Sequence, residues 1–139
     1  MKRIRYMNGA GSVCFGKLND QGEATRLEGD CYSEQRDTGI IESVSKLLAP
    51  VEPKDIICIG LNYRKHAAEG KQAIPDHPVV FMKNLGSVQN PSDPIYLPRR
   101  LRSDSVDYEC ELAVVIGREC YNVSKVNALD YVLGYTCAN

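Results

Sequence analysis

The segment from Ser105 to Gly117 constrains the fold more than any other part of the chain, because its character changes halfway along. In its first half the acidic residues Asp107, Glu109 and Glu111 stand at alternate positions. Side chains of a β-strand alternate between faces, so this spacing predicts that the three carboxylates line one side. The second half, 112–116, is apolar at every position, which is typical of a strand buried on both faces. We therefore expect a strand that carries acidic side chains to the mouth of a β core.

Glu109 and Glu111 are the candidate metal ligands of this strand. Neighbours on one face of a strand lie roughly 6 to 7 Å apart, so two flexible glutamates can converge on one ion. Without a cation their charges would repel, and burying them uncompensated would be costly. Ligation by oxygen alone suits Mg²⁺ or Mn²⁺, with Ca²⁺ also possible, better than Zn²⁺. A solvated strand face remains the alternative interpretation of the same pattern.

The rest of the chain predicts an α+β fold that is predominantly β. Short strands are expected at Arg3 to Met7, Ser12 to Lys17 and Ala24 to Glu28, separated by Asn-Gly and Asp-Gln-Gly turn signals. Apolar residues recurring at three and four positions predict a helix between Thr38 and Ala49. The prolines at 50 and 53 then favour a domain junction, which divides the chain into a small β domain at 1–48 and a second domain at 49–139.

The second domain opens with two more apolar runs. Ile56 to Gly60 predicts a strand buried on both faces, and Val79 to Met82 predicts a core strand that ends on Lys83. A short helix is expected at Tyr63 to Glu69, with Asn62 as its cap. Three prolines make 84–104 an ordered connector, with one short strand expected at 94–97.

His66 and Glu69 are candidates for acid and base catalysis. They lie three positions apart on the expected helix, so they share a face and the carboxylate can orient the imidazole or share a water with it. Lys83 can pair with a substrate carboxylate, and Arg64 can attract an anionic substrate beside Tyr63. The alternatives are a surface ion pair for His66 and Glu69 and a solvated side chain for Lys83.

The composition excludes several other functions. Basic and acidic residues number 17 and 18, so no field of one sign attracts nucleic acid or an anionic membrane, and a small molecule is the expected partner. No apolar stretch is long enough to span a bilayer and the start lacks an apolar signal core, which together favour a cytosolic location. The six cysteines form no Cys-x-x-Cys pair, so we expect reduced, mostly buried thiols.

Taken together, four motifs resemble the fumarylacetoacetate hydrolase family in order and spacing. They are Gly60-Leu61-Asn62-Tyr63-Arg64-Lys65-His66-Ala67-Ala68-Glu69, Phe81-Met82-Lys83, Asp107 to Gly117, and Gly134-Tyr135-Thr136. The resemblance is close from about residue 47 onward, and 1–46 resembles the small N-terminal domain of two-domain bacterial members. It implies that 49–139 forms the first part of a mixed β-sandwich roll.

The resemblance also implies a metal-dependent enzyme of keto acids. Glu109 and Glu111 match two members of the family's acidic triad for magnesium or manganese. The third member is an aspartate that follows the asparagine matched by Asn139, and the sequence stops at that asparagine. His66 and Glu69 match the family's water-activating pair, Tyr63, Arg64 and Lys83 are assigned to substrate binding, and a homodimer is expected.

Three functional hypotheses follow from this resemblance. The first is a hydrolase that cleaves a C–C bond in an acylpyruvate-like or fumarylacetoacetate-like keto acid. The second is an isomerase, tautomerase or decarboxylase of related acids of the oxaloacetate or hydroxymuconate type, because one enolate leads to all of these reactions. The third is an inactive fragment that needs a second chain to complete its site.

Overall fold

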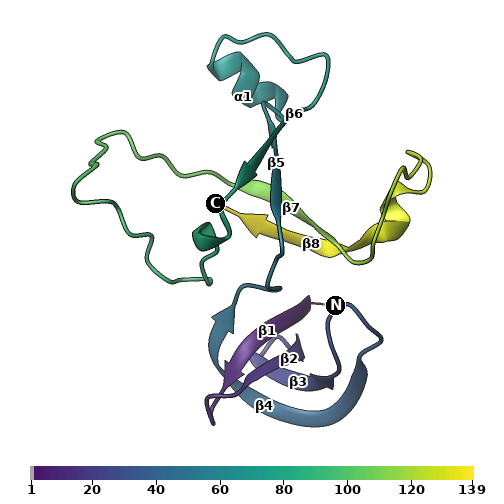
Figure 1. Cartoon of the computed structure of the whole chain (residues 1–139). Coiled ribbons are helices and arrows are strands. Elements are labelled where there is room, and N and C mark those ends of the chain that lie inside the picture. Colours follow the sequence, from purple (N-terminus) through teal and green to yellow (C-terminus); the bar gives the residue numbers. More distant parts are fainter. Residues whose placement is uncertain (1) are drawn as a thin grey trace. The chain divides into compact units, whose positions relative to one another are not determined.

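The computed structural model describes residues 2–139, and its fold is predominantly β, as expected (Figure 1). The elements in chain order are the strands β1 (Lys2–Asn8), β2 (Val13–Leu18), β3 (Glu23–Glu28), β4 (Arg36–Leu48) and β5 (Ile56–Gly60), the helix α1 (Arg64–Glu69), the strand β6 (Val79–Lys83), the 3₁₀ helix η1 (Leu85–Ser87), the strand β7 (Glu111–Ile116), the 3₁₀ helix η2 (Ala128–Tyr131) and the strand β8 (Val132–Ala138).

The chain forms two compact units. One combines the chain up to Pro50 with Asn90–Asn139, and the other is Val51–Gln89. The first unit therefore holds a four-stranded barrel and the β7–β8 hairpin, whereas the second holds β5, α1, β6 and η1. The expected division of the chain at residue 48 stays a prediction.

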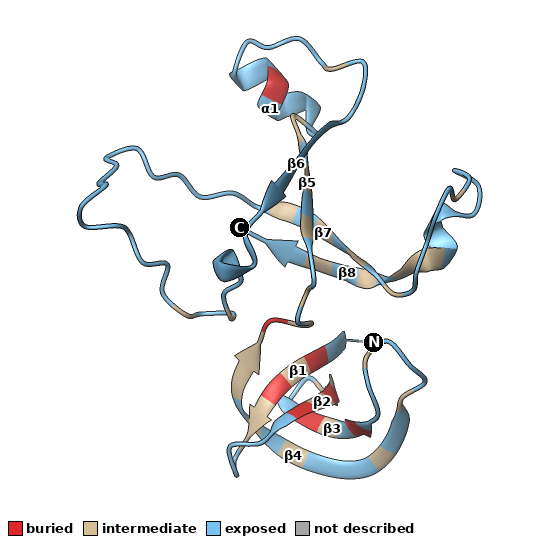
Figure 2. Cartoon of the chain, in the orientation of Figure 1, coloured by how far each residue is buried: buried red, intermediate tan, exposed pale blue. Residues whose placement is uncertain are grey.

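The first four strands close into an antiparallel barrel, in which β1 pairs with both β2 and β4. The three strands expected in this region are confirmed to within a residue or two at each end. Alternate residues of β1 point inward, so Ile4 and Tyr6 are buried. They pack with Cys14 and Ala24, and this cluster is the buried core of the barrel (Figure 2).

The helix expected between Thr38 and Ala49 is wrong, because this segment is the long strand β4. Burial along β4 follows a period of two: Glu42, Val44 and Lys46 are half-buried, whereas Ser43 and Ser45 between them are exposed. Its β-branched residues favour a strand, and pairing with β1 on one edge and β3 on the other satisfies its backbone. Tertiary pairing thus overrides a local pattern that fits a helix.

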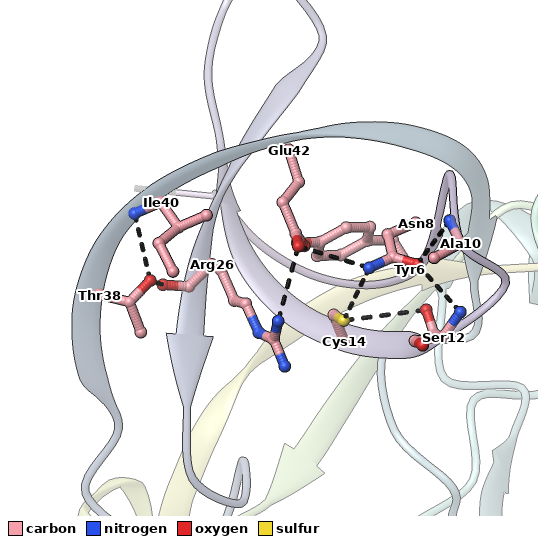
Figure 3. A network of polar contacts seen from close by, with 9 residues as sticks. All are labelled: Tyr6, Asn8, Ala10, Ser12, Cys14, Arg26, Thr38, Ile40 and Glu42. Carbon is pink, nitrogen blue, oxygen red and sulfur yellow. Dashed lines mark hydrogen bonds and ion pairs between the residues drawn. The ribbon is translucent and has the colours of Figure 1, made fainter.

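A polar network ties β1 to β4 inside the barrel (Figure 3). The Tyr6 hydroxyl donates a 2.7 Å hydrogen bond to Glu42 Oε2, and Asn8 Nδ2 donates a 3.4 Å bond to Glu42 Oε1. Arg26 Nη1 lies 3.6 Å from the same Oε1 atom. Burial raises the pKa of the Tyr6 hydroxyl, and its bond to Glu42 raises it further. The phenol therefore stays protonated and acts as a permanent donor across this seam.

The strands β5 and β6 form a two-stranded antiparallel sheet, from Ile56 opposite Lys83 to Gly60 opposite Val79. Both strands lie where the apolar runs predict them, but the expectation of burial on both faces is wrong in the chain as described. Ile57 is 65% exposed and Val80 is 62% exposed. Each strand pairs with the other alone, so no further strand of this unit shields its outward-facing side chains.

The strands β7 and β8 form a second antiparallel hairpin, with Glu111 opposite Ala138 and Leu112 opposite Cys137. The strand begins at Glu111, so the expectation of a strand from Ser105 is wrong for 105–110. Along β7 half-buried and exposed residues alternate, and the exposed face carries Leu112, Val114 and Ile116. The expected burial on both faces is therefore not found here either.

The connector that precedes β7 contains no strand, so the strand expected at 94–97 is wrong. Pro94 and Pro98 both lack the backbone N–H that a ladder requires. All six cysteines are free, as expected, but only Cys14 is buried, and Cys110, Cys120 and Cys137 are exposed. Among residues 2–139 no helix has the length and apolar character needed to cross a bilayer.

Candidate functional site

Glu109 and Glu111 lie where the chain enters β7. Glu111 is the first residue of the strand and is half-buried, whereas Glu109 is exposed in the irregular segment before it. The backbone N–H of Glu109 donates a 2.6 Å hydrogen bond to the side-chain oxygen Oδ1 of Asn139, the residue after β8. This bond continues the contact between the two chain segments beyond the last strand pair, Glu111 with Ala138. The two glutamates thus sit at the end of one hairpin.

Asp107 differs from the two glutamates in its contacts. Its Oδ1 atom accepts a 2.9 Å hydrogen bond from the backbone N–H of Tyr108, so this carboxylate is engaged with its own loop. Within the part of the chain that the structure describes, the side chains of Glu109 and Glu111 make no hydrogen bond or ion pair. Glu109 and Glu111 therefore keep all their carboxylate acceptor sites open in the described chain, whereas Asp107 uses one of its sites within the loop.

The donor set fits a hard divalent cation. Carboxylate oxygens are the ligands that Mg²⁺ and Mn²⁺ prefer, and neither Glu109 nor Glu111 is neutralised by a basic side chain among residues 2–139. Nowhere in this described part do three His, Cys, Asp or Glu side chains converge on one point. Glu109 and Glu111 are the two carboxylates of the described chain that could hold such an ion.

The connector that precedes β7 is hydrogen-bonded to the end of β4 and to the residue after it. Lys46 Nζ on β4 donates a 2.8 Å bond to Asp93 Oδ2, and Asn90 Nδ2 donates a 3.0 Å bond to the same atom. The backbone N–H of Ala49 donates to Asn90 Oδ1 at 3.0 Å. The sequence predicts an ordered connector here, but no local signal identifies the partners of Asn90 and Asp93 near the end of β4.

His66 and Glu69 lie on α1, where the sequence predicts a helix, and belong to Val51–Gln89. The helix is anchored by Ala67, which is 2% exposed, and both candidate side chains are exposed. Their spacing of three places them on one helix face. No hydrogen bond or ion pair joins the two side chains in the described chain, so the geometry leaves both available to a ligand.

The expectation that Asn62 caps α1 is wrong. The N-cap residue is Tyr63, which supplies no side-chain capping bond, and Asn62 lies one position too early to cap the helix. Leu61 has a positive φ of 50°, a turn that lets the chain leave β5 and enter the helix. Arg64 is the first helical residue and is exposed. Tyr63 and Arg64 therefore lie together at the end of α1 that follows β5.

Lys83 ends β6 opposite Ile56, at the start of β5, and is exposed. In the sheet, Gly60 opposite Val79 is the last pair at the other end. Lys83 is therefore at the opposite end of the β5–β6 ladder from the turn that leads into α1. The candidate residues thus fall into two groups, with Tyr63, Arg64, His66, Glu69 and Lys83 in Val51–Gln89, and Glu109 and Glu111 in the other unit.

A family profile described as "Fumarylacetoacetate (FAA) hydrolase C-terminal" matches residues 55–139, which is more than half of the chain. The match includes both groups of candidate residues. The N-terminal barrel lies outside it. His66 and Glu69 of one unit and Glu109 and Glu111 of the other therefore lie within one matched family region.

Curated relatives match about two thirds of the chain. The "Fumarylacetoacetate hydrolase domain-containing protein 2 homolog" of Dictyostelium discoideum is 54% identical over 94 residues, covering 68% of this chain and 30% of the relative. The protein "Oxaloacetate tautomerase fahd2, mitochondrial" of Xenopus laevis is 46% identical over 94 residues, covering 67% of this chain and 29% of the relative. The chain thus spans about a third of these relatives.

A solved structure matches nearly the whole chain, including the barrel. The "5-carboxymethyl-2-hydroxymuconate delta-isomerase" of Mycobacterium smegmatis superposes with a TM-score of 0.83 at 31% identity. The match covers 99% of this chain and 53% of that protein. The barrel and both two-stranded sheets therefore occur together in a longer protein of known structure.

Proposed function

Because the chain belongs to the fumarylacetoacetate hydrolase family, we propose that it contributes to a divalent-metal-dependent hydrolase that cleaves a C–C bond in an acylpyruvate-like keto acid. The observation that carries this proposal is the pair Glu109 and Glu111, two carboxylates two positions apart at one strand end. Neither has a cationic partner among residues 2–139. Carboxylates in such an arrangement are suited to hold Mg²⁺ or Mn²⁺.

When bound there, the cation would supply Lewis-acid stabilisation of the enolate form of a 2-oxo acid. His66 serves as the acid and base that takes a proton from water or returns one to carbon, and Glu69, one turn along α1, orients its imidazole. Lys83, Tyr63 and Arg64 bind and orient the substrate, and the two cationic side chains offset its carboxylate charge.

The second candidate function is tautomerisation or isomerisation of a related acid. Two relatives support it by name, an oxaloacetate tautomerase and a 5-carboxymethyl-2-hydroxymuconate isomerase. Both reactions need stabilisation of an enolate and a group that moves a proton between carbon and oxygen. The cation held by the carboxylate pair would supply the first, and His66 supplies the second. The hydrolase differs because it also requires an attacking water.

A substrate comparison tests the proposal. The intact protein with Mn²⁺ is assayed with an acylpyruvate, with the enol form of oxaloacetate and with 5-carboxymethyl-2-hydroxymuconate, beside Glu109→Gln as the matched inactive control. Cleavage of the acylpyruvate that is lost in the variant supports the hydrolase. Conversion of either other acid without cleavage selects the second candidate. Turnover of none of the three contradicts both functions.

The assembly proposed for the intact protein is a homodimer in the cytosol, with a small keto acid as its partner. Light scattering coupled to size-exclusion chromatography gives the molar mass in solution and so tests the dimer directly. A mass that corresponds to one chain at all protein concentrations would contradict it.

A further inference from the structure

The contact between Glu109 and Asn139 joins residues 30 positions apart at the open end of the β7–β8 hairpin. The donor is the backbone N–H of Glu109 and the acceptor is the side-chain oxygen Oδ1 of Asn139, at 2.6 Å. The regular ladder ends one step earlier, at Glu111 opposite Ala138. A side chain therefore supplies the acceptor that the ladder itself does not supply to Glu109.

This bond matters because the segment before β7 has no regular structure of its own. Residues 107–110 belong to no strand, and each of them is exposed. The backbone of Tyr108 is tied to the neighbouring Asp107 side chain, which is a local contact within the loop. The bond to Asn139 connects the Glu109 backbone to the residue that follows β8.

The relative direction of the two carboxylates depends on this connection. Two residues at alternate positions share a face only while the chain between them stays extended along the ladder. Glu111 is held by its strand pairing, but Glu109 lies beyond the strand end. If its backbone N–H were released, Glu109 could rotate with the loop, and the ladder alone would not fix the direction of its carboxylate relative to that of Glu111.

We propose that Asn139 is a positioning residue of the carboxylate pair: its side-chain oxygen holds the Glu109 backbone against the end of β8, so that Glu109 and Glu111 face one divalent cation. The inference rests on the proposed function of the two glutamates as metal ligands. Asn139 itself need not touch the cation. Groups that orient metal ligands in this way affect metal affinity by roughly 10- to 100-fold in known sites.

The test compares Asn139→Ala with a matched control in the intact protein. Asn127→Ala removes another exposed asparagine of the same unit, whose side chain makes no capping bond to η2. Isothermal titration with Mn²⁺ alone should show affinity at least about 10-fold weaker for Asn139→Ala and unchanged for Asn127→Ala. Amide hydrogen exchange measured without metal should be roughly 3- to 10-fold faster at Glu109 in Asn139→Ala, as expected for one lost hydrogen bond.

A rescue variant separates positioning from general loss of structure. Asn139→Asp keeps an acceptor oxygen at the same position, so it should retain the slow exchange of the Glu109 amide. Unchanged exchange at Glu109 or unchanged Mn²⁺ affinity in Asn139→Ala would overturn the inference. If Asn139→Ala is unchanged while Glu109→Gln and Glu111→Gln lose Mn²⁺, only the positioning role fails. If those two variants also bind Mn²⁺ normally, the proposed function fails with it.

Discussion

The hydroxyl of Tyr6 donates a 2.7 Å hydrogen bond to the carboxylate of Glu42, and this bond crosses the seam where β1 meets β4. Tyr6 is fully buried, so the donor would have no water to replace its partner. Glu42 also accepts a bond from Asn8 and lies near Arg26. One half-buried carboxylate of β4 thus has partners on both β1 and β3.

Removing this donor should destabilise the barrel. We expect Tyr6→Phe to lower the free energy of unfolding by about 1 to 2 kcal/mol, because a buried bond to a charged acceptor is lost while the ring remains. Urea denaturation followed by circular dichroism measures the change. Tyr121→Phe is the matched control, since Tyr121 is 87% exposed. Equal unfolding midpoints for Tyr6→Phe and the wild type would show that the bond from Tyr6 to Glu42 does not stabilise the barrel.

Acid should weaken the attachment of the connector to the barrel. The bond from Lys46 holds the pKa of Asp93 below its ordinary value of 3.8, and the bond from Asn90 lowers it further. A folded-state pKa below the unfolded one means that this stabilisation is complete above the ordinary value. It is lost as the pH falls through the lowered pKa. Asp37, whose pKa is lowered by Lys17 and by the backbone of Gly39, contributes in the same direction.

Asp93→Asn tests this pH dependence. The variant keeps a polar side chain but cannot change charge, so its stability should fall less steeply than that of the wild type as the pH drops below about 4. Urea midpoints measured from neutral pH down to about pH 2 give the two curves. Asp20→Asn, a substitution in an exposed turn, should follow the wild type. Parallel curves for Asp93→Asn and wild type would contradict a role for this ion pair in acid sensitivity.

The strands of this chain are more predictable from sequence than their environments. The apolar runs at 56–60 and 112–116 correctly predict β5 and β7. Each run is short and rich in β-branched residues, and both properties favour a strand over a helix. The faces of these strands are not predictable in the same way. Burial depends on what packs against a strand, and Leu112 and Ile57 remain exposed in the chain as described.

The error at β4 has a similar physical origin. Ile40, Ile41 and Val44 fit a helical period of three and four, yet the segment pairs with β1 and β3. The partner β1 is distant in sequence, so a local window contains no information about this pairing. The contact from Glu109 to Asn139 is unpredictable for the same reason, although the candidate residues themselves are recognisable from local motifs.

The proposed acid and base residues should affect turnover more than metal binding. We expect His66→Ala to lower kcat about 10²- to 10⁴-fold, the usual range for a general acid or base, with little change in Mn²⁺ affinity. Glu69→Gln should have a smaller effect in the same direction, because Glu69 is proposed to act through His66. Steady-state kinetics on whichever acid the intact protein converts measures both variants.

His77→Ala provides the control for this prediction, since His77 is the other histidine of the chain and is also exposed. It should retain wild-type kcat. A loss of activity in His77→Ala that equals the loss in His66→Ala would remove the reason to assign catalysis to α1.

The central claim is that Glu109 and Glu111 bind one divalent cation, and Mn²⁺ titration of the intact protein tests it most directly. Wild-type protein should bind Mn²⁺, and Glu109→Gln and Glu111→Gln should each bind it at least about 10-fold more weakly, because each loses a charged oxygen ligand. Glu119→Gln, an exposed substitution after β7, should bind as the wild type does. Unchanged Mn²⁺ affinity in both Glu109→Gln and Glu111→Gln would contradict the claim.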